Sequence, residues 1–192
     1  MKNAPFTITV ATIILIVFGV EILTHTVGGE TSLLGLGALP DSGQLRGEYW
    51  RFATYSFLHL NWLHLIANVL LLLWIGRILE GKLGSRVVAT IYVCSVVASA
   101  VAIILVHGLH PHEGATMGAS GGVFGLLAGA LILTHSSNRG SFEWSSRLRR
   151  WVWVALIIGL AVSLLPGVSL AGHIGGIIGG AIAAYAAPLR TA

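Results

Sequence analysis

Long apolar stretches alternate with short polar segments along the whole chain. Six of these stretches approach the length of about 20 apolar residues that a helix needs to cross a bilayer. They cover residues 6–26, 52–78, 87–106, 118–133, 148–165 and 170–187. The fourth and the sixth are short, so we expect one end of each helix to lie inside the protein. The pattern predicts an all-α membrane protein, a bundle of six transmembrane helices.

The segment between the first two stretches is too apolar to be simply solvated. Residues 27–50 are rich in Leu, Gly and Trp, and residues 35–40 read as backbone that lies in the membrane interface. We therefore expect a partly membrane-embedded first loop. The first apolar stretch is too long for a signal peptide, so we expect it to be a helix. Residues 1–192 are expected to form one domain.

Composition supports a membrane protein and excludes several other classes. Of the 192 residues, 55% are hydrophobic and only 9% are charged, whereas a soluble domain carries about 25% charged residues. A soluble enzyme, a secreted disulfide scaffold and a disordered chain are therefore excluded. The single cysteine, Cys94, excludes an intrachain disulfide. The 25 glycines indicate helices that pack closely enough for their backbones to touch.

The basic residues are distributed very unevenly between the two sides of a six-helix topology. Arg46 and Arg51, both in the first loop, lie on one side. The other nine lie opposite: Lys2, Arg77, Lys82, Arg86, Arg139, Arg147, Arg149, Arg150 and Arg190. Cytoplasmic loops carry an excess of Lys and Arg. We therefore expect both termini to be cytoplasmic. No basic run of five or more residues points to nucleic acid.

Polar residues inside membrane helices are expensive and are functional candidates. His64 and Asn68 are four residues apart, so a helix presents them on one face. His59 is turned roughly 140° away from His64 on the same predicted helix. These side chains either form a functional site or join neighbouring helices by hydrogen bonds.

A serine lies at the start of the fourth stretch, within Gly118-Ala119-Ser120-Gly121-Gly122. The letters match the G-x-S-x-G elbow of soluble hydrolases, but that elbow needs a strand before the serine. A helix N-terminus offers free N–H groups and a positive dipole end, which would stabilise an oxyanion. Alternatively, Ser120 is an N-cap.

Glycines indicate how a second polar residue, His173, could reach Ser120. Small residues that recur every four positions let two helices meet backbone to backbone. The fourth and sixth stretches both carry such rows: Gly121, Gly125 and Gly129, and Gly172, Gly176 and Gly180. If these faces pack together, Ser120 and His173 come within hydrogen-bond reach. A serine beside a histidine base is the minimum for nucleophilic acyl transfer.

Taken together, these motifs resemble those of the rhomboid intramembrane serine proteases, over about residues 48–185. Their order along the chain is what makes the resemblance specific. It rests on Glu48-Tyr49-Trp50-Arg51, on His59, His64 and Asn68 (H-x4-H-x3-N), on Gly76, Glu80 and Gly84, on Gly118-Ala119-Ser120-Gly121, and on Ala171-Gly172-His173-Ile174-Gly175-Gly176.

The resemblance implies a catalytic site that opens to the outer membrane face. Ser120 would be the nucleophile and His173 the general base, with no acidic third member. The backbone N–H of Ser120 and the side chains of His64 and Asn68 would form the oxyanion hole. The structural residues near the site would be His59, Arg51, Gly118, Phe124, Gly121 and Gly176, with Phe124 at a position often occupied by tyrosine.

The resemblance also implies the partners and the cellular place of the protein. The substrates would be single-span membrane proteins, cut near the outer face of a bacterial inner membrane. We expect no cofactor and no nucleic acid partner. Two other classes stay open: a catalytically inactive relative that binds helices, and a channel or transporter. The retained Ser120 and His173 disfavour the first, and the absence of repeats and paired carboxylates disfavours the second. A branch that processes C-terminal sorting tails is not excluded.

Two further polar features lie outside these motifs. His107, His110 and His112 form an H-x2-H-x-H pattern in an outer loop, and we expect them to be solvated, with no metal. Glu21 lies near the outer end of the first stretch and is expected to reach the membrane interface.

Overall fold

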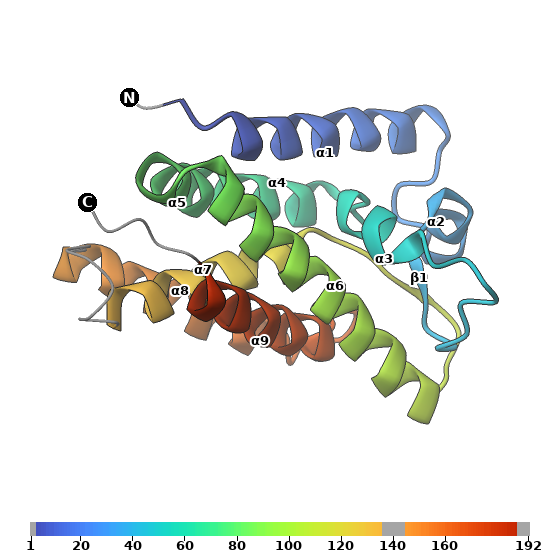
Figure 1. Ribbon diagram of the computed structural model, residues 1–192. Helices are drawn as coiled ribbons and strands as arrows, with labels where there is room; N and C mark the ends of the chain where they lie inside the picture. The colour runs from blue at the N-terminus through green and yellow to red at the C-terminus, as the bar shows by residue number, and fades with distance from the viewer. Residues whose placement is uncertain (1–2, 136–144, 188–192) are drawn as a thin grey trace.

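A computed structural model of the chain describes residues 3–135 and 145–187, and most of these are helical (Figure 1). The longer helices are α1 (Pro5–Leu23), α4 (Trp62–Leu71), α6 (Ser85–Leu109), α7 (Ser120–His135), α8 (Ser146–Val162) and α9 (Leu170–Ala186). Shorter elements are α2 (Glu30–Leu36), β1 (Leu39–Pro40), α3 (Arg51–Thr54), the 3-10 turn η1 (Tyr55–Phe57), the π-helical turn η2 (Leu72–Gly76), α5 (Arg77–Leu83) and β2 (Ala115–Thr116).

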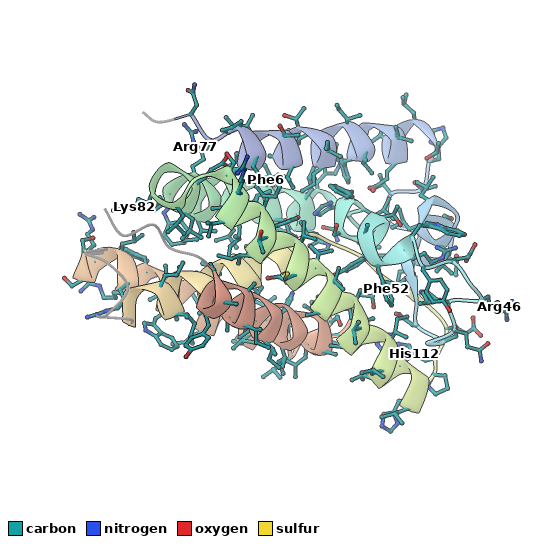
Figure 2. All side chains as sticks on the ribbon, in the orientation of Figure 1. Phe6, Arg46, Phe52, Arg77, Lys82 and His112 are labelled. Carbon is teal, nitrogen blue, oxygen red and sulfur yellow. The ribbon has the colours of Figure 1, made fainter. Side chains whose placement is uncertain are left out.

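Helices α6, α7 and α9 pack against one another. Helix α5 lies at one end, whereas α2, α3, β1 and the end of α6 lie at the other (Figure 1). Figure 2 shows Arg77 and Lys82 near α5, and Arg46 and His112 at the opposite end. Strands β1 and β2 pair antiparallel, with Leu39 opposite Thr116. This pairing ties the first loop to the segment that leads into α7.

Three helices are long and apolar enough to cross a membrane: Pro5–Leu23, Trp62–Leu83 and Ser85–Leu109. Helices α7 and α9 are also apolar but shorter. Large apolar side chains remain exposed around the molecule, such as Leu15 at 51%, Leu70 at 62% and Leu105 at 64%. Exposed apolar surface of this extent is expected where lipid rather than water is the solvent. The chain is therefore an integral membrane protein, and the six-helix count stays a prediction.

The predicted helix over residues 52–78 is wrong at both ends. The chain first forms α3 and η1, then runs in extended conformation before the helix begins at Trp62. The side chain of Asn61 caps this helix by accepting a hydrogen bond from the N–H of His64 at 2.9 Å. The helix then continues to Leu83 through η2. Residues 52–61 mix apolar and polar side chains, and hydropathy alone does not locate the break. His59 consequently lies outside the helix.

For the other five predicted helices, both ends agree with the structure to within three residues. Residues 6–26, 87–106, 118–133, 148–165 and 170–187 correspond to α1, α6, α7, α8 and α9.

Helices α7 and α9 meet along the expected glycine rows. A Cβ on Gly176 would overlap the backbone of Gly121, and one on Gly180 would overlap the backbone of Gly125. Farther along, Gly129 faces Ala184. At these positions the two backbones touch, because there is no side chain between them.

A second glycine row on α9 packs against α6. Cβ atoms on Gly175 and Gly179 would collide with Ala102 and Ala98 of α6. Gly172, which we expected in the row that faces α7, instead faces Ile103 and Ser99 of α6. The reason is that α9 is wedged between two helices, so its glycines divide between two faces.

Glu80 joins three helices at the α5 end of the molecule. Its carboxylate accepts hydrogen bonds from the backbone N–H groups of Phe6 and Thr7, at 2.8 and 2.9 Å, and from the hydroxyl of Thr7 at 2.7 Å. It also accepts from the hydroxyl of Ser85 at 2.6 Å. It thus satisfies the free N–H groups at the start of α1. Nearby, a Cβ on Gly76 would collide with Thr7, and Gly84 has a φ of +81°.

We expect Gly180→Ala to lower the stability of the protein, because its methyl group would overlap the backbone of Gly125. Overpacking of this kind costs about 1–3 kcal/mol. Gly19→Ala in α1 is the matched control, since its Cβ would have nothing within 4 Å. The measurement is the melting temperature of each variant in detergent. Equal melting temperatures for the two variants would contradict the backbone contact between α7 and α9.

Candidate active site

Ser120 and His173 face each other across the contact between α7 and α9. Nε2 of His173 lies 2.8 Å from Oγ of Ser120. Ser120 is the first residue of α7, and its hydroxyl pairs with His173 rather than with a helix N–H, so it is not an N-cap. His173 is 7% exposed. The hydrogen-bond reach expected from the glycine rows is therefore present.

Ser163, just after the end of α8, contacts the other nitrogen of His173. Its Oγ lies 2.5 Å from Nδ1 of His173 and 2.8 Å from the carbonyl oxygen of Gly159. The carbonyl can only accept, so the single hydroxyl proton of Ser163 points to Gly159. The oxygen of Ser163 then accepts a hydrogen bond from Nδ1–H of His173. This tautomer leaves the lone pair of Nε2 toward the hydroxyl of Ser120.

Phe124 fixes the plane of the His173 ring. The two rings stack with their centroids 4.1 Å apart and their planes 10° apart. On α8, a Cβ on Gly159 would overlap the tip of the Phe124 ring. The ring of Phe124 is thus held against His173 by the bare backbone of α8. The ring packing expected here does not need the hydroxyl of a tyrosine.

Gly118 brings the backbone before Ser120 close to His64. It has a φ of +128°, and a Cβ would lie 2.6 Å from Cε1 of His64. Its N–H donates to the carbonyl of Tyr55 at 2.9 Å, and the hydroxyl of Tyr55 donates to the carbonyl of Val96 on α6 at 2.8 Å. These contacts leave no room for a side chain at position 118. The same holds at Gly121, where a Cβ would overlap Ser99.

His64 lies beside Gly118, and Asn68 follows it one turn later on α4. Asn68 is 5% exposed, and its Nδ2 donates to the carbonyl of His64 at 2.9 Å, one turn earlier on α4. One N–H of the amide group is thereby used. Among the described residues, no hydrogen bond joins the side chain of His64 or Asn68 to Ser120.

His59 is held in the extended segment before α4. Its backbone N–H donates to Oε1 of Glu21 at 3.1 Å, and its Nδ1 lies 3.2 Å from the carbonyl of Phe57. Its ring centroid is 5.1 Å from that of His64. The expectation that Glu21 reaches the membrane interface is wrong, because its side chain is fully buried against this segment.

Arg51 organises the first loop. Its guanidinium donates to the carbonyls of Leu34 and Ala38, at 2.6 and 2.7 Å. It also forms an ion pair with Glu48, in which Nη2 of Arg51 lies 2.7 Å from Oε2 of Glu48. A planar guanidinium can make these contacts at once because its donors point in fixed, different directions.

Sequence reasoning missed Ser163. It lies two residues before the end of the predicted helix 148–165, where a hydroxyl is unremarkable beside an apolar run. The only signal is its closeness along the chain to His173, across the Pro166-Gly167 turn. No periodicity reveals that the turn folds the hydroxyl onto the imidazole.

The arrangement has the parts that acyl transfer needs. A hydroxyl lies at a helix N-terminus, an imidazole nitrogen lies within hydrogen-bond distance of it, and a third group contacts the other nitrogen of the imidazole. The N-terminus of α7 adds backbone N–H groups and a positive dipole end where an oxyanion would form.

Comparison with known proteins gives matches to rhomboid proteins, the family that the sequence motifs resemble. The sequence model of the Rhomboid domain matches residues 46–189. The chain is 35% identical to "Rhomboid protease GluP" of Bacillus subtilis (strain 168), over 93% of this chain and 34% of that protein. It is 31% identical to "RHOMBOID-like protein 5" of Arabidopsis thaliana, over 83% of this chain and 50% of that protein. It is 30% identical to "Rhomboid-related protein 3" of Homo sapiens, over 70% of this chain and 35% of that protein. The chain thus spans a third to a half of the length of these relatives.

We expect Arg51→Lys to loosen the first loop, since one ammonium group cannot reach Glu48 and both carbonyls together. The cost is about 1.5–3 kcal/mol for each hydrogen bond lost by a charged group. Hydrogen–deuterium exchange over residues 34–40 should become faster by at least several-fold. Arg46→Lys, at an exposed position of the same loop, should leave the exchange unchanged. Equal exchange in both variants would contradict the role of Arg51.

Proposed function

The chain belongs to the rhomboid family, and from this premise we propose that it is an intramembrane serine endopeptidase. We propose Ser120 as its nucleophile and His173 as its general base. The observation that carries the proposal is the 2.8 Å contact between Nε2 of His173 and Oγ of Ser120. It lies in a protein whose surroundings are lipid, where polar side chains are expensive unless they serve a function.

In the proposed reaction, Nε2 of His173 takes the proton of Ser120 as Oγ attacks the scissile carbonyl carbon. The resulting oxyanion would be stabilised by the backbone N–H of Ser120 and by the side chains of His64 and Asn68. The imidazolium then gives its proton to the leaving amine, and an acyl-enzyme remains. Water, deprotonated by His173, hydrolyses the ester and restores Ser120.

No carboxylate is needed in this mechanism to orient the base. Ser163 accepts the Nδ1–H of His173 and so selects the reactive tautomer. Stacking on Phe124 fixes the ring plane. We propose Ser163 as a positioning residue, because it acts on His173 and not on the substrate. His59, Arg51, Gly118, Gly121 and Gly176 would support the site through the backbone and loop contacts described above.

The substrate would be a single-span membrane protein, cut near the outer face of a bacterial inner membrane. Ser120 lies only four residues after β2, which belongs to the loop end of the molecule. The separation of Arg77 and Lys82 from Arg46 supports a cytoplasmic position for the α5 end (Figure 2). Lys2, Arg139 and Arg190, three of the nine basic residues expected on the cytoplasmic side, lie outside the described residues. We further propose that residues 1–192 form one domain with six spanning helices.

The direct test is cleavage of a single-span reporter in liposomes. Wild type should cut it, whereas Ser120→Ala and His173→Ala should lower the rate by about 100-fold or more, since each removes a reacting group. A fluorophosphonate probe should label wild type on Ser120 and leave Ser120→Ala unlabelled. Cleavage by Ser120→Ala would show that the nucleophile is another residue. A folded wild type that neither cuts nor reacts with the probe would favour an inactive helix-binding relative.

A second test concerns Ser163. Ser163→Ala should lower kcat by about ten-fold, the effect of a free-energy change near 1.4 kcal/mol, and should leave KM unchanged. Ser163→Thr retains the hydroxyl and should restore most of the rate. Ser42→Ala in the exposed first loop is the control and should match wild type. An Ala variant with wild-type kcat would refute a positioning role, and an equal loss in the Thr variant would indicate a packing role instead.

A further inference from the structure

Three side chains from separate segments meet at the loop end of the molecule. Asp41 directly follows β1, His107 lies in the last turn of α6, and His112 lies in the loop before β2. Figure 2 marks His112 at this end. One potential ligand atom from each residue lies within 4.8 Å of the other two. His110, the middle histidine of the H-x2-H-x-H pattern, is not in the cluster, whereas Asp41 joins it from another loop.

The distances in the cluster fit a shared ion. Nδ1 of His107 lies 2.9 Å from Oδ1 of Asp41, and Nε2 of His112 lies 3.6 Å from Oδ2 of Asp41. A tetrahedral zinc ion with bonds of 2.0–2.2 Å separates its ligand atoms by roughly 3.3–3.6 Å. The two distances from the histidines to Asp41 therefore differ from those around a zinc ion by only a few tenths of an ångström.

The surrounding hydrogen bonds orient the three groups as ligands. Nδ1 of His112 lies 3.2 Å from the carbonyl of His110, which can only accept, so the proton is on Nδ1 and the lone pair of Nε2 faces Asp41. The hydroxyl of Thr116 donates to Oδ1 of Asp41 at 2.7 Å. Metal-binding histidines and carboxylates are held by contacts of this kind.

Nδ1 of His107 is an unsatisfied buried atom. It is close to Oδ1 of Asp41, but its N–H would not point along that line, and it has no hydrogen-bond partner among the described residues. A lone pair that faces a carboxylate is repulsive unless a cation lies between them. A metal ion at this point would satisfy Nδ1 of His107, Nε2 of His112 and the carboxylate together.

The local charge also favours a cation. Oδ2 of Asp41 and Oε2 of Glu30 lie 2.8 and 3.0 Å from the same point, the position that a Cβ on Gly114 would take. In the described ranges, no lysine or arginine forms an ion pair with either carboxylate. Two carboxylates this close repel each other, and a divalent cation would offset the repulsion.

We propose that Asp41, His107 and His112 bind a divalent transition metal of the zinc class, with a fourth position open to water or to Glu30. Two imidazoles and one carboxylate are ligands that suit Zn²⁺ rather than Mg²⁺ or Ca²⁺. The ion would clamp the first loop to the end of α6 and to the segment that leads to Ser120. Backbone hydrogen bonds already join Asp41 to His112 and Gly114 there, at 3.1 and 3.2 Å.

The test is a Zn²⁺ titration of the untagged protein in detergent, in competition with a chromogenic chelator. We expect one saturable site per chain that excess Mg²⁺ does not displace. His112→Ala should weaken Zn²⁺ binding by at least about 10–100-fold, the range seen when groups that support a metal site are lost. Its side chain is 57% exposed, so the variant should fold, which circular dichroism checks. Asp41→Asn should weaken binding as well.

Two controls separate this site from other histidines. His110→Ala retains the backbone carbonyl that His112 uses and should bind Zn²⁺ as wild type does. His173→Ala should also bind normally, since the proposed active site is not involved. Zn²⁺ should raise the melting temperature of wild type but not of His112→Ala. The proposal would be overturned by an absence of saturable binding, by wild-type affinity in His112→Ala, by displacement with Mg²⁺, or by loss of binding in either control.

Discussion

The approach of α7 and α9, backbone against backbone, is the constraint on which the rest of the structure depends. Ser120 and His173 lie on these two helices, and their 2.8 Å contact exists only because Gly176 and Gly180 lie directly on Gly121 and Gly125. Any side chain in this row would push the helices apart, and the hydroxyl would lose the imidazole. In lipid there is no hydrophobic force to drive helices together, so close packing of small residues has to hold them.

Buried polar groups are then satisfied by partners on other helices. Glu80 takes up the free N–H groups of α1, the hydroxyl of Tyr55 reaches the backbone of α6, and Ser163 reaches His173. Each of these hydrogen bonds adds little net stability, but an unpaired polar group in an apolar setting is costly. The partners therefore restrict how the helices can be placed relative to one another. The proposed general base, His173, is likewise oriented by the neutral hydroxyl of Ser163 and by the stacked ring of Phe124. A soluble serine protease would use a carboxylate for this purpose.

The loop end of the molecule supports the start of α7 from outside the helix core. Arg51 gathers the carbonyls of Leu34 and Ala38, and β1 pairs with β2 four residues before Ser120. The proposed metal cluster would add a third tie between the same segments. All three restrain the backbone that leads to Ser120, whose N–H would receive the oxyanion in the proposed reaction.

The sequence by itself determined which residues meet at the centre. Hydropathy located five of the six apolar helices closely, and the glycine spacing predicted that the fourth and sixth would touch. Tertiary structure alone decided three other points. Residues 52–61 lie outside the helix that begins at Trp62 and that Asn61 caps, and the apolar side chains among them look alike in either conformation. Ser163 meets His173 because a turn folds α8 back onto α9. Asp41 meets His107 because strand pairing joins distant loops. Hydropathy and spacing report local periodicity, whereas these contacts depend on how separate segments pack.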